Sequence, residues 1–179
     1  RAQYLNAITR KDLEHYRISI LIRRDRSGKM SLNELKVVRS DDVDGFTLKG
    51  LKEKAKVISV HDGDTLDVVF YLHGDNLVRF TCRLLGYDAP ELKKKKPSRK
   101  ALFARDFLAH ICMGDDPDEF DDSGTWETDE LQELLDDSDN LVYVKFGKFD
   151  SFGRALVNIK TSPRGQSIND LMSEFVDNQ

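Results

Sequence analysis

The chain has 179 residues, of which 39% are hydrophobic, with 28 Lys and Arg against 32 Asp and Glu and a net charge of −4. This length and composition suit one globular domain, or a small domain with an appendage, and exclude a low-complexity chain. No apolar run reaches the length of a membrane span, so we expect no membrane segment. No secretory signal is visible, which leaves the compartment open and slightly favours an intracellular one.

The negative net charge is concentrated in one segment. Residues 115–139 hold 13 acidic residues and no Lys or Arg, so the rest of the chain carries 28 basic and 19 acidic residues. A basic body favours a polyanionic partner such as nucleic acid, although most charge runs are only solvated surface.

Residues 1–50 are predicted to form a helical N-terminal segment. Leu13, Tyr16 and Ile20 recur at helical spacing, and Ser31 with Glu34 forms a capping box for a second helix. Residues 40–50 are predicted to be a linker.

The break between these two predicted helices resembles a degenerate EF-hand loop. Asp25, Ser27, Gly28 and Glu34 match the pattern of such a loop, but Arg23 stands where its first carboxylate belongs. We therefore expect a structural or protein-interaction role for this segment rather than calcium binding.

Residues 51–179 are predicted to form a domain of strands and two helices. Strands are predicted at 56–60, 65–72, 77–85, 141–146 and 154–159, and helices at 98–113 and 167–175. This order predicts an α+β fold with a mainly β core: a five-stranded OB-type Greek-key barrel with a helix between strands three and four, a C-terminal helix and the N-terminal helical appendage. Cys82 and Cys112 fall inside these elements and are expected to be reduced core thiols.

The acidic segment forms an insertion, 114–140, between the first of these helices and the fourth strand. A solvated, partly disordered loop is the default expectation for such a composition. The alternatives are a nucleic-acid mimic that inhibits the protein or binds basic proteins, and an additional cation site.

Carboxylates cluster at two predicted strand ends. Asp62 and Asp64 flank a glycine, and Asp88 and Glu91 flank Ala-Pro after the third strand. By spacing alone these residues fit either ordinary turns or the oxygen ligands of a hard cation.

Three motifs containing these residues resemble the staphylococcal nuclease family. They are His61-Asp62-Gly63-Asp64-Thr65, the block from Arg83 to Glu91, and Gly153-Arg154. They occur in the family's order, and the resemblance covers about residues 55–175.

The resemblance implies a role for each matching position. Asp64, Asp88 and the backbone carbonyl of Ala89 would bind one calcium ion, with magnesium as the second choice, while Asp62 and Thr65 lie near the metal and its waters. Glu91 would activate the attacking water, and Arg83 and Arg154 would hold the scissile phosphate. The implied activity is metal-dependent hydrolysis of DNA, RNA or both.

The resemblance is weaker around the bound nucleotide. Ser151-Phe152 stands where the family often has Lys-Tyr, so Phe152 supplies an aromatic ring without a neighbouring cation. Lys93 and Lys94 follow Glu91 and are expected to contact the phosphate backbone. The alternative function is a non-catalytic module that binds nucleic acid or protein, as in Tudor-type members of this fold, and the N-terminal segment or the acidic insertion is the expected protein-binding region.

Overall fold

The computed structural model describes residues 36–93, 95–121 and 123–179. Contacts divide the chain into two units, residues 1–46 and 47–179. The helices and the EF-hand-like loop predicted before residue 36 lie outside the described residues. In the first unit, the described residues 36–46 are exposed turns and coil.

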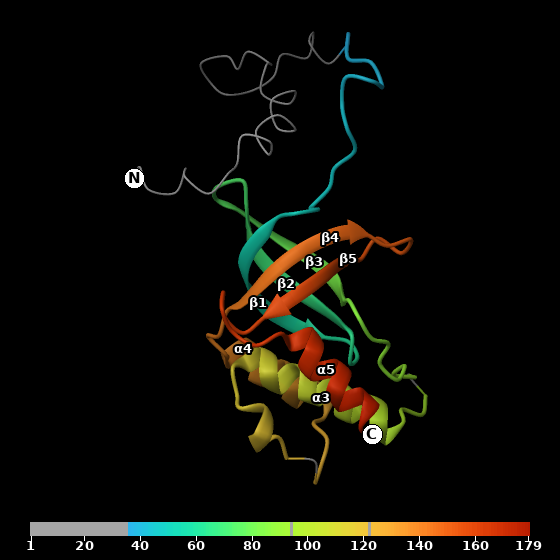
Figure 1. The fold of residues 1–179 in the computed structure, drawn as a ribbon, viewed down its shortest axis with the longest axis vertical. Coiled ribbons are helices and arrows are strands. Elements are labelled where there is room, and N and C mark those ends of the chain that lie inside the picture. Colours follow the sequence, from blue (N-terminus) through green and yellow to red (C-terminus); the bar gives the residue numbers. More distant parts are fainter. Residues whose placement is uncertain (1–35, 94, 122) are drawn as a thin grey trace. The chain divides into compact units, whose positions relative to one another are not determined.

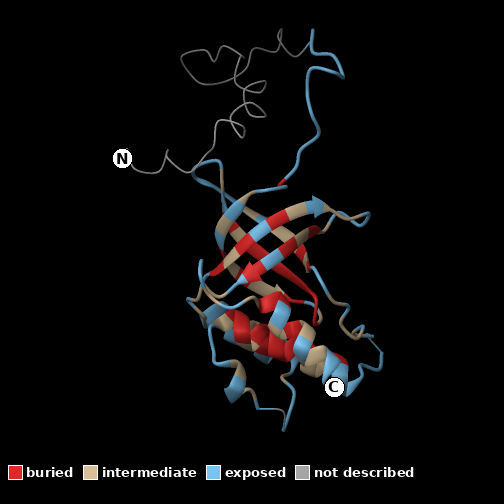
Figure 2. Ribbon diagram, viewed as in Figure 1, coloured by how far each residue is buried: buried red, intermediate tan, exposed pale blue. Residues whose placement is uncertain are grey.

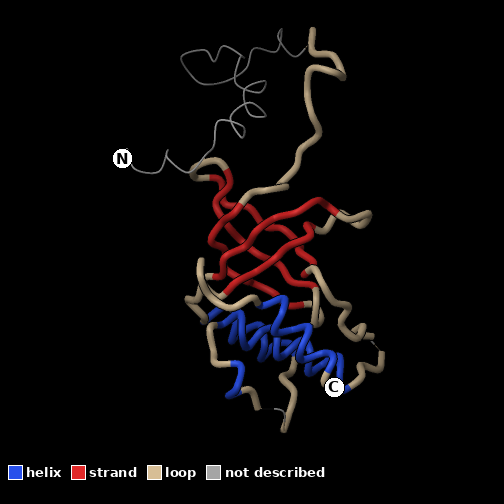
Figure 3. Tube along the Cα trace, viewed as in Figure 1, coloured by secondary structure: helices blue, strands red, loops and turns tan. Residues whose placement is uncertain are grey.

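The second unit is built on a closed barrel of five strands. The strands are β1 Lys52–Val60, β2 Thr65–Leu72, β3 Asn76–Leu84, β4 Val142–Phe149 and β5 Ala155–Lys160. They follow the order β1-β2-β3-β5-β4 around the barrel, and only the β3–β5 pair is parallel. The strands cross as a barrel above the helices in Figure 3, which confirms the predicted OB-type fold.

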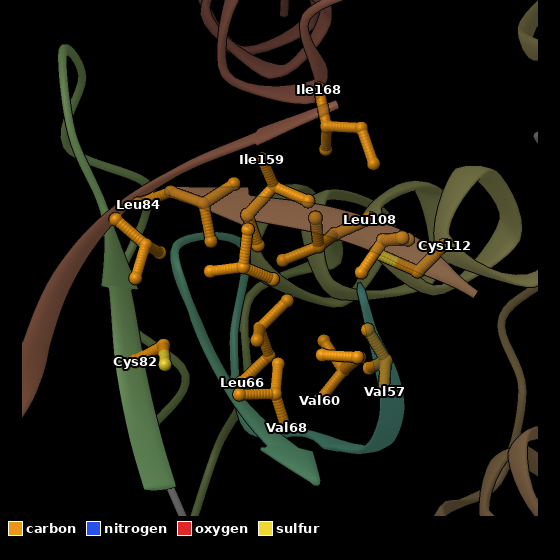
Figure 4. Close-up of a cluster of buried hydrophobic side chains, with 14 of the residues drawn as sticks. Val57, Val60, Leu66, Val68, Cys82, Leu84, Leu108, Cys112, Ile159 and Ile168 are labelled. Carbon is orange, nitrogen blue, oxygen red and sulfur yellow. The ribbon is translucent and has the colours of Figure 1, made fainter. Parts of the chain in front are cut away.

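Alternating side chains fill the barrel. In β2, Leu66, Val68 and Phe70 are at most 2% exposed, as expected for strand residues that share one face. Figure 4 shows Leu66 and Val68 in the buried cluster with Leu108 and Cys112 of the neighbouring helix. The core therefore joins the barrel interior to the helical layer. Cys82 and Cys112 are buried free thiols, as predicted.

Two helices lie across one end of the barrel (Figure 1). Helix α3, Arg99–Met113, begins at Ser98, whose Oγ accepts from the Ala101 backbone N at 3.2 Å, and ends at Gly114. Helix α5, Ile168–Asp177, packs beside it, and the rings of Phe107 and Phe175 stack with centroids 4.0 Å apart. No helix in the described part of the chain is long and apolar enough to span a membrane.

The last residues of the predicted linker, 47–50, pack against the barrel. Leu48 is 2% exposed, and the Gly50 backbone N donates to the Phe146 carbonyl at 2.9 Å. Residues 47–50 therefore belong to the second unit, and the boundary lies at residue 46 rather than 50. The three apolar residues of this run, Val43, Phe46 and Leu48, follow no helix or strand period, so the sequence did not reveal this packing.

The described residues of the acidic insertion, 114–121 and 123–140, contain regular structure, whereas the default expectation was a solvated, partly disordered loop. The insertion forms a 3-10 turn, η1 Pro117–Glu119, and a helix, α4 Thr128–Asp137, whose Leu131 and Leu135 are buried. Charged residues of α3 hold it in place: Arg105 Nη2 donates to the Trp126 carbonyl at 2.6 Å, and the Trp126 backbone N donates to Asp106 Oδ2 at 3.0 Å. Two leucines one turn apart and one anchored aromatic residue outweigh the unfavourable composition.

Candidate functional site

The turn between β1 and β2 fixes the first carboxylates. Asp62 Oδ1 accepts from the backbone N of Asp64 at 3.0 Å and of Thr65 at 2.8 Å, and burial raises the pKa of Asp62. Tyr87 closes the turn from the other side, because its hydroxyl donates to the Gly63 carbonyl at 2.7 Å. The turn is therefore held rigidly beside the segment that follows β3.

The second part of the site is an arginine between two carboxylates. Thr65 of β2 pairs with Arg83 of β3, which brings the Arg83 side chain next to Asp64. Arg83 Nη2 lies 3.2 Å from Asp64 Oδ2 and also donates to Asp88 Oδ1. The Ala89 backbone N lies 3.3 Å from the same Asp64 oxygen. Two carboxylates therefore share one cationic group.

The third part comes from the turn before β5. Arg154 Nη1 donates to Thr65 Oγ1 at 3.1 Å, and Arg154 Nε donates to Asp150 Oδ2 at 2.8 Å. Thr65 Oγ1 in turn donates to Asp64 Oδ1 at 2.7 Å. One hydrogen-bonded network therefore joins both arginines, and it runs through the residues Asp88, Arg83, Asp64, Thr65, Arg154 and Asp150.

Asp150 is a member of the site that the sequence did not single out. Its Oδ1 accepts from the backbone N of Phe152 and of Arg154, each at 2.9 Å. Burial alone would raise the pKa of Asp150, but the hydrogen bonds from Arg154 and the backbone outweigh it and lower the pKa. The Asp-x-x-Gly turn before Arg154 was the available signal, since such an aspartate turns back onto the following backbone.

The remaining predicted residues lie outside this network. Glu91 and Lys93 are exposed on the loop after β3, and within the described residues Glu91 contacts none of the network side chains through a hydrogen bond or ion pair. Phe152 is 83% exposed, with the Arg154 guanidinium carbon 5.6 Å from its ring centroid. Lys94 lies outside the described residues.

His61 belongs to a separate cluster. Its Nε2 lies 3.1 Å from Asp67 Oδ2, and Arg79 donates to the same carboxylate oxygen. The hydrogen bonds from Arg79 and Thr81, together with His61, outweigh burial and lower the pKa of Asp67. His61 is therefore a partner of Asp67 rather than a member of the arginine network.

The donor set of the network bears on cation binding. Among the described residues, no group of three or more His, Cys, Asp or Glu side chains could hold a metal ion. Asp64 and Asp88 do meet at one guanidinium nitrogen, which puts two carboxylates around a single positive charge. Two carboxylates with backbone, water and phosphate oxygens suit a hard divalent cation, whereas a closed protein cage is absent from the described residues.

Comparison of the sequence with models of known protein families found no match. A comparison with curated proteins found no match either. The OB-type barrel is established by the structure, and the function of the site rests on its own residues.

Proposed function

We propose that this chain is a metal-dependent phosphodiesterase that hydrolyses DNA, RNA or both. One observation carries the proposal: Thr65 and Asp64 connect Arg83 and Arg154 in a single network at the ends of three strands. Two guanidinium groups fixed beside a carboxylate pair form a site for one phosphodiester, which is anionic and gains charge on its oxygens during hydrolysis.

The arginines keep donors for a phosphate. Arg154 uses Nε and Nη1 within the network, and Arg83 uses Nη2. Each guanidinium has five N–H donors, so Nη2 of Arg154 and Nε and Nη1 of Arg83 remain for phosphate oxygens. A planar guanidinium can make two parallel hydrogen bonds to one phosphate, which fixes its orientation as well as its charge.

Asp64, Asp88 and the Ala89 carbonyl are the proposed ligands of a divalent cation, with calcium preferred to magnesium. Such an ion supplies positive charge to the phosphate oxygens when bound. Arg83 lies in ion-pair contact with both carboxylates, and its single positive charge leaves this group with a net negative charge that suits a cation. Asp62 shapes the turn that presents Asp64, and Thr65 fixes the carboxylate of Asp64 through its hydroxyl.

Glu91 is the proposed acceptor of the proton from the attacking water. Its loop is anchored at one end by Ala89 but leaves the Glu91 side chain exposed to solvent. Hydrogen bonds of a catalytic acid or base are often formed only when substrate is bound. Glu91→Gln keeps the size of the side chain and removes the base, so we expect turnover to fall while oligonucleotide affinity stays the same.

The direct test is incubation with single- and double-stranded DNA and RNA, each with calcium, magnesium or chelator. Arg83→Ala and Arg154→Ala should each reduce turnover by roughly 10²–10³, the usual cost of removing one donor to the transition state. Arg164→Ala is the control, since Arg164 is exposed in the loop after β5. If the Arg83 or Arg154 variant kept full activity, the proposed mechanism would be refuted.

The second candidate is a binding module without catalysis. The exposed position of Glu91 favours it, because the network itself supplies phosphate-binding groups but no free carboxylate base. Oligonucleotide binding without hydrolysis under every metal condition would support this candidate over the first.

A further inference from the structure

Strands β1, β4 and β5 present a regular array of lysines on the outside of the barrel. The register pairs Lys52 with Lys145 and Lys54 with Tyr143, and it places Lys160 opposite Tyr143. Asn158 completes the array opposite Lys145. We call this surface the lysine face; it consists of Lys52, Lys54, Lys145 and Lys160 around Tyr143 and Asn158.

These side chains point away from the core. All four lysines and Asn158 are exposed, whereas the intervening Val144 and Ile159 are at most 1% exposed. Figure 2 shows this alternation of buried and exposed residues along β4 and β5. Lys54 Nζ lies 5.3 Å from the centre of the Tyr143 ring, so the tyrosine supports one of the cations.

The lysine face is unfavourable for the stability of the isolated barrel. Lys52 and Lys145 are directly opposite each other, and like charges in that position destabilise a sheet. The outward positions of the three strands hold no carboxylate to offset them. Within the described residues, the side chains of Lys52, Lys145 and Lys160 make no ion pair or hydrogen bond. This uncompensated charge indicates an anionic partner.

The spacing of the array identifies the kind of anion. Neighbouring strands are about 4.8 Å apart, and alternate residues of one strand are about 6.7 Å apart, so the cations form a regular grid over this side of the barrel. Such a grid suits a chain of repeated negative charges better than one small anion. Arg154 is separated from Asn158 and Lys160 by even numbers of residues, so all three lie on the same face of the strand. From the rise per residue of a strand, the proposed hydrolytic site lies roughly 20 Å from Lys160 along β5.

We propose that the lysine face binds the phosphate backbone of a nucleic acid strand whose scissile phosphate occupies the Arg83–Arg154 site. The choice of nucleic acid rests on the proposed function, while the presence of an anion-binding surface does not. Phosphate contacts of this kind add affinity and orientation without reading the sequence. Long substrates should therefore gain from the lysine face, and short ones should not.

The test uses the triple variant Lys52→Gln/Lys145→Gln/Lys160→Gln. Lys54 is retained because it packs on Tyr143. Binding of a labelled oligonucleotide, single-stranded or duplex, is followed by fluorescence anisotropy in chelator over a range of salt concentrations. Loss of three phosphate contacts should reduce the slope of log K against log salt by about 2–3. The matched control, Lys→Arg at the same three positions, should keep the wild-type slope.

Hydrolysis separates this proposal from the proposed function. The glutamine variant should cleave a small chromogenic phosphodiester at the wild-type rate but lose kcat/KM on a long polynucleotide. If the wild type cleaves nothing, the proposed function fails, and the anisotropy slopes still decide the role of the lysine face. An unchanged slope in the glutamine variant would overturn the proposal. So would binding of phosphatidylserine vesicles or an acidic peptide by the wild type with no binding of oligonucleotide.

Discussion

Gly63 is the position where the geometry of the candidate site can be tested by one methyl group. A Cβ added to Gly63 would lie 2.6 Å from the Ala104 Cβ and 2.8 Å from the Ala89 Cβ. Ordinary contact begins near 3.4 Å, so α3 and the segment after β3 must each move by several tenths of an ångström. Neither alanine has a flexible side chain that can turn away, so the backbone must shift.

We expect Gly63→Ala to cost about 1–3 kcal/mol, the usual range for overpacking a rigid site. The unfolding entropy of a unit the size of 47–179 is roughly 0.28 kcal/mol/K, so the Tm should fall by about 4–11 °C. Because the glycine lies between Asp62 and Asp64, and Ala89 follows Asp88, phosphodiester hydrolysis should fall as well.

The measurement is thermal unfolding by circular dichroism, with Gly124→Ala as the matched control. A Cβ at Gly124 has no neighbour within 4 Å, and its backbone is not left-handed, so its Tm should change little. Adding Ala104→Gly to Gly63→Ala removes the closer contact, and the double variant should be more stable than the sum of the two single changes predicts. Equal Tm values for Gly63→Ala and Gly124→Ala would refute the proposed packing of the turn.

Three further changes test other parts of the molecule. Asp150→Asn should lower kcat/KM about tenfold, as expected for a lost charge-assisted hydrogen bond to Arg154. Because the pKa of Asp150 lies below its ordinary value of 3.8, the stability that its carboxylate contributes is present above that pH. The urea unfolding free energies of variant and wild type should therefore converge as the pH falls through the lowered pKa. Phe152→Ala should leave the Tm unchanged. If one base stacks on the ring, the variant should lose up to about 1–3 kcal/mol of binding free energy for single strands and show a higher KM. An unchanged KM would exclude that contact. Arg105 and Asp106 form a buried ion pair, with 2.6 Å between Arg105 Nη2 and Asp106 Oδ1. Arg105→Leu removes the partner of this carboxylate and should cost roughly 3–5 kcal/mol in urea unfolding, with faster proteolysis in the acidic insertion. A wild-type cleavage pattern would contradict the anchoring role of Arg105.

The sequence alone determined the order and nature of the five strands and of helices α3 and α5. Alternation in β2 and helical spacing in α3 are local patterns, and Ser98 and Gly114 mark the ends of α3 by local hydrogen bonding. The candidate carboxylates were also visible, because Asp-Gly and Asp-Ala-Pro turns are local patterns of a few residues, whereas Arg83 and Arg154 were singled out only by the resemblance to the nuclease family.

Only the tertiary structure decided which of these residues meet. Thr65 and Arg154 are 89 residues apart, and the parallel pairing of β3 with β5 brings the start of β5 beside the end of β3. The same strand register aligns the lysines of β1, β4 and β5 into one face. Register between distant strands depends on how the whole barrel closes over its core, so no local pattern specifies it. For the same reason Glu91, which the sequence placed with the arginines, lies outside their network, while Asp150 lies within it.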